Sequence, residues 1–283
     1  MRTIGVVAAG AVCLAVVRLI AIWPSERENG LRVISGAAVD YILTPEDMSA
    51  FPATPDCTFD VAEDDTVILT AGDSLVGMQR SANGVNAEQL AEHAPRAYAV
   101  DAEGNLLGID RKYFGQYGDS GFSLAVPLPI EGLRMAGSHN AGAVYLFGGS
   151  GQSSNRVYTM YRDGVLDVLA EVPSQVVGVA DSDAAVYVAT EREIYRVAPR
   201  AQNLAFKIAD DAPPIRSIAA CDDQVVYFST DSRVYAVRGL AAIAVMANMG
   251  GIVRCRHGSL FVWNRDRGVL ARMTGLPAAL HLQ

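Results

Sequence analysis

The feature that most constrains the fold is a weak internal repeat of about forty residues. Each copy contains an apolar stretch, a short polar turn and a run rich in β-branched or aromatic residues. The last residues of successive copies are 34 to 42 positions apart. A period of this size indicates one supersecondary unit stacked several times. The six copies are Val61–Ile68, Val100–Leu107, Ser138–Tyr145, Ala180–Tyr187, Ala220–Tyr227 and Arg254–Phe261.

The strands within one repeat can be counted between Gln175 and Asp210. Four short apolar runs are separated there by turn residues, and the following repeat shows the same order. Four antiparallel strands every forty residues are typical of a β-propeller blade. The sequence therefore predicts an all-β fold, a six-bladed β-propeller, with seven blades as the alternative. The four runs are Val176–Ala180, Val186–Thr190, Glu193–Val197 and Leu204–Ile208.

The last repeat has no convincing fourth strand. Its third strand is expected at Gly268–Met273, and the following Leu276–Gln283 begins with Leu-Pro, a poor start for a strand. We expect a strand from Leu31–Leu43 to complete this blade, which would join the chain ends and remove a free sheet edge. The predicted propeller thus spans residues 31–283.

Two segments near the N-terminal end interrupt the strand pattern. Thr44–Asp56 contains three prolines and is expected to be a loop. Asn86–His93 has the composition of about two helical turns, which Pro95 would end.

The first 24 residues are predicted to be a transmembrane signal anchor, followed by a linker at residues 25–30. Residues 4–23 are nearly all apolar, with Arg18 as the one charge, and twenty such residues at helical rise cross a bilayer core. No small-residue cleavage site follows the apolar core. A cleaved signal peptide and a buried helix are the alternatives. The anchor predicts a single-pass protein of the cell membrane whose bulk is extracytoplasmic, in the periplasm.

The charge of the chain limits its partners. The formal net charge is −8, and no cluster of Lys and Arg interleaved with aromatic residues occurs. A nucleic-acid binder would carry a basic surface. We therefore expect no nucleic-acid partner.

Three of the strand patterns carry a family resemblance. Val186–Thr190 reads Val-Tyr-Val-Ala-Thr, Val226–Thr230 reads Val-Tyr-Phe-Ser-Thr, and Val144–Phe147 is similar. The chain resembles β-propeller proteins with YVTN or NHL-like repeats over about Thr58–Thr274. That group includes enzymes, sensors and scaffolds, so the resemblance implies the fold and leaves the function open.

The register of the repeats brings potential metal ligands together. The positions six residues before the end of each copy lie at the end of the innermost strand, near the central tunnel. Four successive copies offer possible transition-metal ligands there, His139, Asp181, Cys221 and Cys255. A tunnel-end metal ion, a Cys221–Cys255 disulfide and unlinked thiols are the open alternatives, and no other cofactor is expected. These positions hold Asp101, His139, Asp181, Cys221 and Cys255.

Two further motifs resemble functional sites. Gly72–Ser74 resembles the nucleophile block of GDSL esterases, but no Asp-x-x-His follows, so a hairpin is expected there. The aromatic, glycine-rich segment Arg111–Gly118 is expected in the connection after the hairpin of the second repeat and is the best surface candidate for ligand or partner contact. Its candidate residues are Arg111, Tyr113, Phe114 and Tyr117.

Two functions remain open from the sequence. The first is a membrane-anchored extracytoplasmic propeller that acts as a binding or scaffold module for a partner protein or polymer in a membrane complex. It fits the anchor and the absence of a recognisable catalytic cluster. The second is a propeller hydrolase or lyase that acts on a sugar or lactone, with a metal or histidine at the tunnel mouth.

Overall fold

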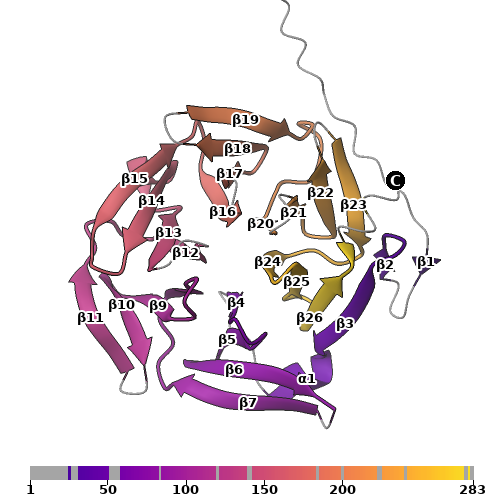
Figure 1. Ribbon diagram of the computed structural model, residues 1–283, viewed down its shortest axis with the longest axis horizontal. Coiled ribbons are helices and arrows are strands. Elements are labelled where there is room, and N and C mark those ends of the chain that lie inside the picture. The colour runs from indigo at the N-terminus through magenta and orange to yellow at the C-terminus, as the bar shows by residue number, and fades with distance from the viewer. Residues whose placement is uncertain are drawn as a thin grey trace, which may run out of the picture.

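The computed structural model is a ring of six β-sheets around a central axis (Figure 1). The predicted all-β, six-bladed propeller is confirmed, and the seven-bladed alternative is wrong. Within each blade the strands are antiparallel, and in blades one to four they follow the chain order outward from the axis. The structure describes residues 25–26, 31–50, 58–82, 84–118, 121–138, 142–182, 185–198, 201–221, 225–238, 241–276 and 280.

Each blade takes its four main strands from one repeat, except that the last repeat supplies three. Blades one to three contain β4 (Phe59–Val61), β5 (Val67–Ala71), β6 (Ser74–Ser81), β7 (Gly84–Ala91), β8 (Ala97–Val100), β9 (Leu106–Asp110), β10 (Tyr113–Gly118), β11 (Gly121–Pro127), β12 (Arg134–Gly137), β13 (Ala143–Phe147), β14 (Arg156–Tyr161) and β15 (Leu166–Glu171). Blades four to six contain β16 (Val176–Ser182), β17 (Ala185–Thr190), β18 (Glu193–Ala198), β19 (Ala201–Lys207), β20 (Ser217–Ala220), β21 (Val226–Ser229), β22 (Arg233–Arg238), β23 (Ala241–Ala247), β24 (Ile252–Arg256), β25 (Ser259–Asn264) and β26 (Val269–Thr274). A short 3-10 helix, η2 (Gly151–Ser153), lies between β13 and β14.

The N-terminal strands close the ring and serve two blades. Strand β3 (Ala38–Leu43) pairs with β26 and completes blade six, so the structure contains the pairing expected for Leu31–Leu43. Strand β2 (Arg32–Val33) pairs with β23 at the outer edge of blade five. Strand β1 (Ser25–Glu26), at the start of the predicted linker, pairs with β2. We call the contact between blades five and six, together with β2 and β3, the closing seam.

The core lies between neighbouring blades. The largest set of buried apolar side chains fills the closing seam, where Val33, Ile34, Met246 and Met273 are at most 1% exposed. Inner strands of neighbouring blades approach closely, which requires small residues. A Cβ on Gly137 of β12 would lie 2.5 Å from the carbonyl oxygen of Val100 in β8, so only glycine fits there.

Two local predictions are wrong. Part of the expected loop Thr44–Asp56 is the short helix α1 (Pro45–Ala50). Thr44 begins it with a capping box: its backbone N–H donates to Asp47 Oδ2 at 2.8 Å, and the backbone N–H of Asp47 donates back to Thr44 Oγ1 at 3.4 Å. Proline suits the first helical position because that N–H has no partner in any case.

The helix expected at Asn86–His93 is instead β7, the outermost strand of blade one. Strand β7 pairs with β6 from Ser81↔Gly84 to Leu75↔Ala91. The composition favours a helix locally, but pairing along the whole edge of a sheet outweighs a weak local propensity.

None of the helices in the described part of the chain is long and apolar enough to cross a membrane. The predicted anchor at residues 4–23 lies outside the described residues.

Candidate functional site: the axial channel and its wide mouth

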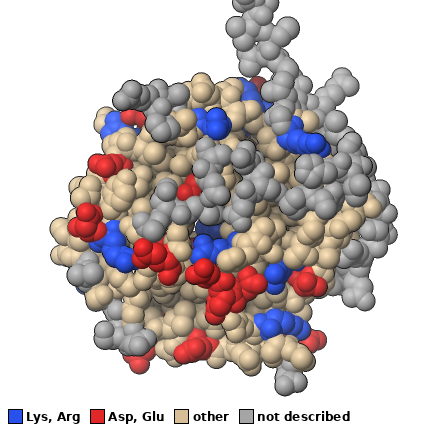
Figure 2. All heavy atoms as spheres, in the orientation of Figure 1, with Lys and Arg blue, Asp and Glu red and all other residues tan. Residues whose placement is uncertain are grey.

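The six inner strands, β4, β8, β12, β16, β20 and β24, run in the same direction along the axis and line a channel. Two cavities lie along it. The first is wide, about 750 Å³, and lies where the inner strands begin. The second is narrow, about 50 Å³, and lies toward their ends. We call them the wide mouth and the narrow section. Figure 2 shows one face of the ring, with Lys and Arg atoms at the central hollow and Asp and Glu atoms beside it.

Asp60 of β4 is one of the buried acids that line the narrow section. Its side chain is 11% exposed and accepts hydrogen bonds from the backbone N–H groups of Val61 at 2.9 Å and Val100 at 2.8 Å. Arg254 Nε lies 3.8 Å from Asp60 Oδ1. Burial raises the pKa of the Asp60 carboxyl, and Arg254 and the two backbone donors offset part of that rise. Asp60 therefore holds a proton more readily than an exposed aspartate does.

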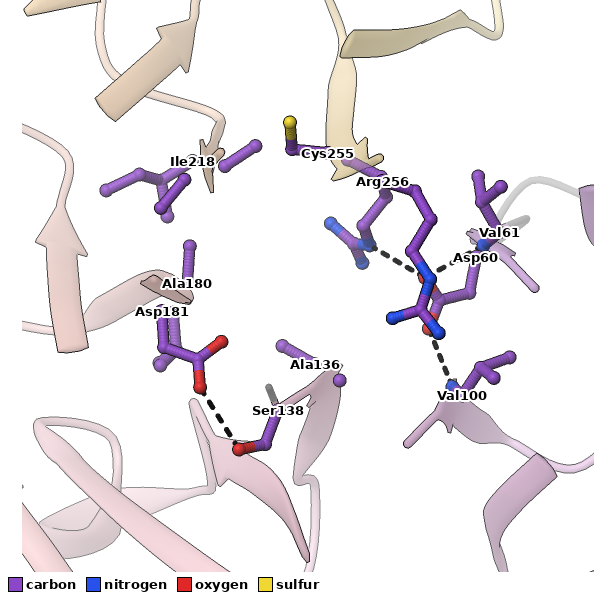
Figure 3. A pocket seen from close by; sticks show the side chains of 15 residues that line it. Asp60, Val61, Val100, Ala136, Ser138, Ala180, Asp181, Ile218, Cys255 and Arg256 are labelled. Atoms are coloured by element: carbon purple, nitrogen blue, oxygen red, sulfur yellow. Dashed lines mark hydrogen bonds and ion pairs between the residues drawn. The ribbon is translucent and has the colours of Figure 1, made fainter. Parts of the chain in front are cut away.

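Two arginines face the channel from one strand. Arg254 and Arg256 both line the narrow section from β24, because alternate residues of a strand point to the same side. Arg254 donates from Nη1 to the carbonyl oxygen of Val253 at 2.9 Å and lies over the Phe59 ring at 5.9 Å. Arg256 extends past Asp60 in Figure 3 and donates to the carbonyl oxygen of Asp101 at 3.5 Å.

Asp181 lies on the opposite wall from Asp60 (Figure 3). The carboxylate accepts hydrogen bonds from Ser138 Oγ at 3.1 Å and from the Tyr145 hydroxyl at 2.9 Å. The residue is 4% exposed. Its charge is thus held by two hydroxyl donors from blade three, which is how a buried carboxylate is normally accommodated.

The wide mouth carries side chains of both charges. Arg134 is already engaged: it donates to the carbonyl oxygen of Val176 at 2.7 Å and stacks over the Phe147 ring at 4.9 Å. In contrast, Arg96, Gln175 and Asp266 are exposed. No side-chain hydrogen bond or ion pair to another described residue holds these three. The remaining lining residues include Glu191, Asp231, Trp263, Asn264 and Arg265.

The described residues of the predicted tunnel-end register, Asp101, Asp181, Cys221 and Cys255, lie at or next to the ends of inner strands. Asp101 is fully buried and caps its own turn: Oδ1 accepts from the backbone N–H groups of Glu103 at 2.9 Å and Asn105 at 2.8 Å. Arg162 pairs with its other oxygen at 2.8 Å. The carboxylate of Asp101 is therefore a structural group of blade two.

Cys221 and Cys255 form a disulfide with a Cα–Cα distance of 5.4 Å, one of the alternatives that the sequence left open. A disulfide sulfur is not a thiolate, so this form offers neither as a metal ligand. His139 lies outside the described residues. Among the described residues, no three His, Cys, Asp or Glu side chains are grouped to hold a metal ion. The metal site at His139, Asp181, Cys221 and Cys255 stays an untested prediction.

The aromatic segment Arg111–Gly118 lies in the second blade itself, in the β9–β10 hairpin and strand β10, and not in a connection after the hairpin. Arg111, in the left-handed region at φ 52°, and Tyr113, 41% exposed, are at the surface. Phe114 is 1% exposed and packs between blades two and three. Tyr117 is half-buried. Burial, and after it the charge of Asp110, raises the pKa of its hydroxyl. Arg111 and Tyr113 are therefore the most exposed of the four candidate residues, and their contact with a ligand or partner stays a prediction.

The motif at Gly72–Ser74 lies at the β5–β6 hairpin, as expected, with Ser74 opening β6. Ser74 Oγ donates to the carbonyl oxygen of Glu92 at 3.3 Å.

The sequence reasoning missed Asp60, Arg134, Arg254 and Arg256. A signal was present: Arg254 and Arg256 flank Cys255 at alternate positions of an inner strand, where both charges must point to one side. Charged residues with this spacing in a strand next to the axis indicate a polar channel.

No protein-family model matches the chain, and no curated protein matches it in sequence. Solved structures match its fold. The gluconolactonase XC5397 from Xanthomonas campestris superposes with a TM-score of 0.58 at 15% identity, over 88% of this chain and 91% of that one. Virginiamycin B lyase from Staphylococcus aureus gives 0.55 at 10% identity, over 84% and 99%.

The PQQ domain of pyranose dehydrogenase from Coprinopsis cinerea gives a TM-score of 0.60 at 10% identity, over 90% of this chain and 98% of that one. The chain is therefore a six-bladed β-propeller of the same architecture as these proteins. Likeness at such low identity establishes the fold, and the function has to be argued from the site.

Proposed function

We propose that this protein is a membrane-anchored, extracytoplasmic binding propeller whose wide mouth receives a polar segment of a partner protein or polymer. The observation that carries the proposal is the wide mouth itself. It is the largest described cavity on the channel, and the side chains of Arg96, Gln175 and Asp266 in its lining have no hydrogen-bond or ion-pair partner among the described residues. Unpaired groups of both charges suit a polar partner with complementary charges.

Two observations support the extracytoplasmic location. The Cys221–Cys255 disulfide is typical of proteins in an oxidising compartment, since cytosolic thiols are kept reduced. The apolar run at residues 4–23 has the length of a membrane span. Residues 4–23 would then hold the protein in the membrane, and the wide mouth of the propeller would bind the partner.

The proposal is tested by site-specific photo-crosslinking of the full-length protein in its native membranes. We place p-benzoylphenylalanine at Gln175, at the wide mouth. The matched control is Val165, which is 48% exposed in the β14–β15 hairpin on the opposite face of the ring. We expect one defined product from position 175 and none from 165, and we expect Arg96→Glu to reduce it. Absence of a product at 175, or the same products at both positions, would refute the proposal.

The second candidate is a hydrolase or lyase acting on a sugar or lactone. The observation that favours it is Asp60, whose raised pKa and position at the channel suit a general acid. The purified protein would then turn over a lactone or glycoside, and Asp60→Asn would remove that activity while leaving the fold intact. Turnover that persists in Asp60→Asn would exclude Asp60 as the acid.

A further inference from the structure

The narrow section holds two arginines beside a single carboxylate on one side of the channel. Arg254 and Arg256 both enter it from β24, and Asp60 is the carboxylate that lies against them. Asp181 lies across the channel, where Ser138 and Tyr145 donate hydrogen bonds to it. The two guanidinium groups therefore share the Asp60 carboxylate on their side of a buried space.

The arginines also have donors left over. Among the described residues, the Nε atoms of Arg254 and Arg256 are buried and make no hydrogen bond. A buried charged donor without an acceptor is costly, so an acceptor from outside the chain would be favoured here. A cavity of about 50 Å³ has room for a few water molecules or for one small oxyanion.

Arg134 from blade three lines the wide mouth, on the same channel as the two arginines of the narrow section. Burial, and after it the charge of Arg254, lowers the pKa of the Arg134 guanidinium.

We propose that the narrow section of the channel binds a small oxyanion, such as a sulfate or a carboxylate, which accepts hydrogen bonds from Arg254 and Arg256. Guanidinium groups suit oxyanions because their planar donors match two acceptor oxygens. The anion is either free in solution or an acidic group of the partner in the wide mouth. Only that second source rests on the proposed function.

The test is isothermal titration of the full-length protein with sodium sulfate, and separately with sodium acetate, at constant ionic strength. Arg254→Gln should weaken sulfate binding at least tenfold. Asp60→Asn should strengthen it several-fold, because it removes the competing carboxylate. General damage to the fold would weaken sulfate binding in both variants, whereas a binding site predicts weaker binding in Arg254→Gln and stronger binding in Asp60→Asn. If Arg254→Gln does not fold, the Asp60→Asn measurement still tests the proposal.

Arg272→Gln is the matched control. Arg272 also belongs to blade six and also lies over a phenylalanine ring, Phe261 at 5.8 Å, but it pairs with Asp65 and does not line the channel. We expect its sulfate affinity to stay within twofold of the wild type. No saturable binding by the wild type, or equal losses in Arg254→Gln and Arg272→Gln, would overturn the proposal.

The source of the anion is decided by repeating the crosslinking at position 175 in saturating sulfate. Loss of the product assigns the anion to an acidic group of the partner, and an unchanged product assigns it to the solution. The titration stands even where no crosslinked product forms, so failure of the anion site and failure of the proposed function can be told apart.

Discussion

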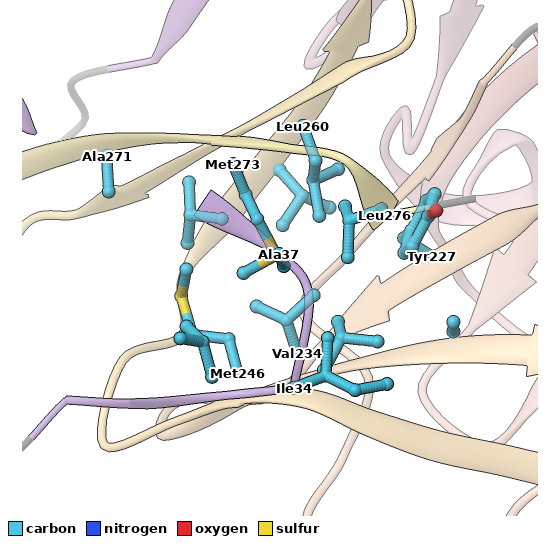
Figure 4. Packing of buried hydrophobic residues seen from close by; sticks show 14 of the residues in the cluster. Ile34, Ala37, Tyr227, Val234, Met246, Leu260, Ala271, Met273 and Leu276 are labelled. Atoms are coloured by element: carbon cyan, nitrogen blue, oxygen red, sulfur yellow. The ribbon is translucent and has the colours of Figure 1, made fainter. Parts of the chain in front are cut away.

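The closing seam is lined by apolar side chains, whereas the axial channel is lined in part by charged ones. In the seam, buried apolar side chains from β2, β3 and blades five and six pack together (Figure 4). Its inner end carries the Cys221–Cys255 disulfide. In the channel, arginine and aspartate side chains face a cavity, and the Nε atoms of Arg254 and Arg256 make no hydrogen bond to the described residues.

This difference indicates that the closing seam stabilises the fold, whereas the channel carries the groups that are available for function. A propeller needs its first and last strands held together, because an open ring would expose sheet edges and apolar faces. The seam provides that closure through a covalent link and apolar burial. The channel carries groups that the fold does not need for closure. Substitutions in the seam should therefore change mainly the free energy of unfolding, and substitutions in the channel should change mainly anion binding and the pH dependence of stability.

The largest effect on stability is expected from removing the disulfide. Crosslinking residues 34 positions apart restricts the unfolded chain, which corresponds to about 4 kcal/mol at 25 °C in the chain-entropy model. Cys221→Ser/Cys255→Ser should lower the free energy of unfolding by that order in urea titrations. A reducing agent should lower the free energy of unfolding of the wild type by the same amount, and should not change that of the double variant. A wild type insensitive to reductant would show that the closing seam does not depend on the covalent link.

The next effect is expected from the strand that closes blade six. Leu43 of β3 is fully buried between blades six and one, so Leu43→Ala removes apolar contacts and leaves a cavity. Such substitutions cost about 2–5 kcal/mol. Asp40→Ala is the matched control, because Asp40 is exposed on the same strand and should change stability by less than about 0.5 kcal/mol. Similar losses in both variants would mean that β3 acts through its backbone pairing alone.

The closing seam was more accessible from the sequence than the channel was. Each repeat contains recognisable apolar runs, so the strands could be counted from the sequence. That count predicted six blades and the role of Leu31–Leu43. Phe114 shows the limit of that reasoning. The sequence placed it at the surface in an aromatic segment, yet the alternation along β10 turns Phe114 into the core while Tyr113 faces solvent.

The channel could be located from the sequence, but its chemistry could not be assigned. The register correctly brought Asp101 and Asp181 to the ends of inner strands. Their partners come from residues far away in the chain: Arg162 for Asp101 and Tyr145 for Asp181, 61 and 36 positions away. Which charges meet across the axis depends on how six separate sheets pack together. A single strand does not encode that arrangement.

The channel predicts a pH effect that the apolar seam lacks. The folded-state pKa of Asp60 is raised, so the stability contributed by its bound proton is present below the unfolded pKa, near 3.8, and is lost as pH rises through the folded value. Asp60→Asn cannot lose this proton. Relative to the wild type, its free energy of unfolding should therefore increase as pH rises from about 4 to 7. Urea titrations across this range test the sign, and a difference that is constant or falls with pH would contradict it.

The smallest effect is expected at the outer rim, which belongs to neither region. Arg80 of β6 pairs with Asp47 of α1 at 2.9 Å, and its side chain is 39% exposed. Water screens such a pair, and holding two flexible side chains together costs entropy, so Arg80→Ala should lower the free energy of unfolding by less than about 1 kcal/mol. Added salt should weaken the effect further. A loss as large as that of Leu43→Ala would show that α1 fastens blade one as firmly as the closing seam fastens blade six, and the seam would no longer be the main point of closure.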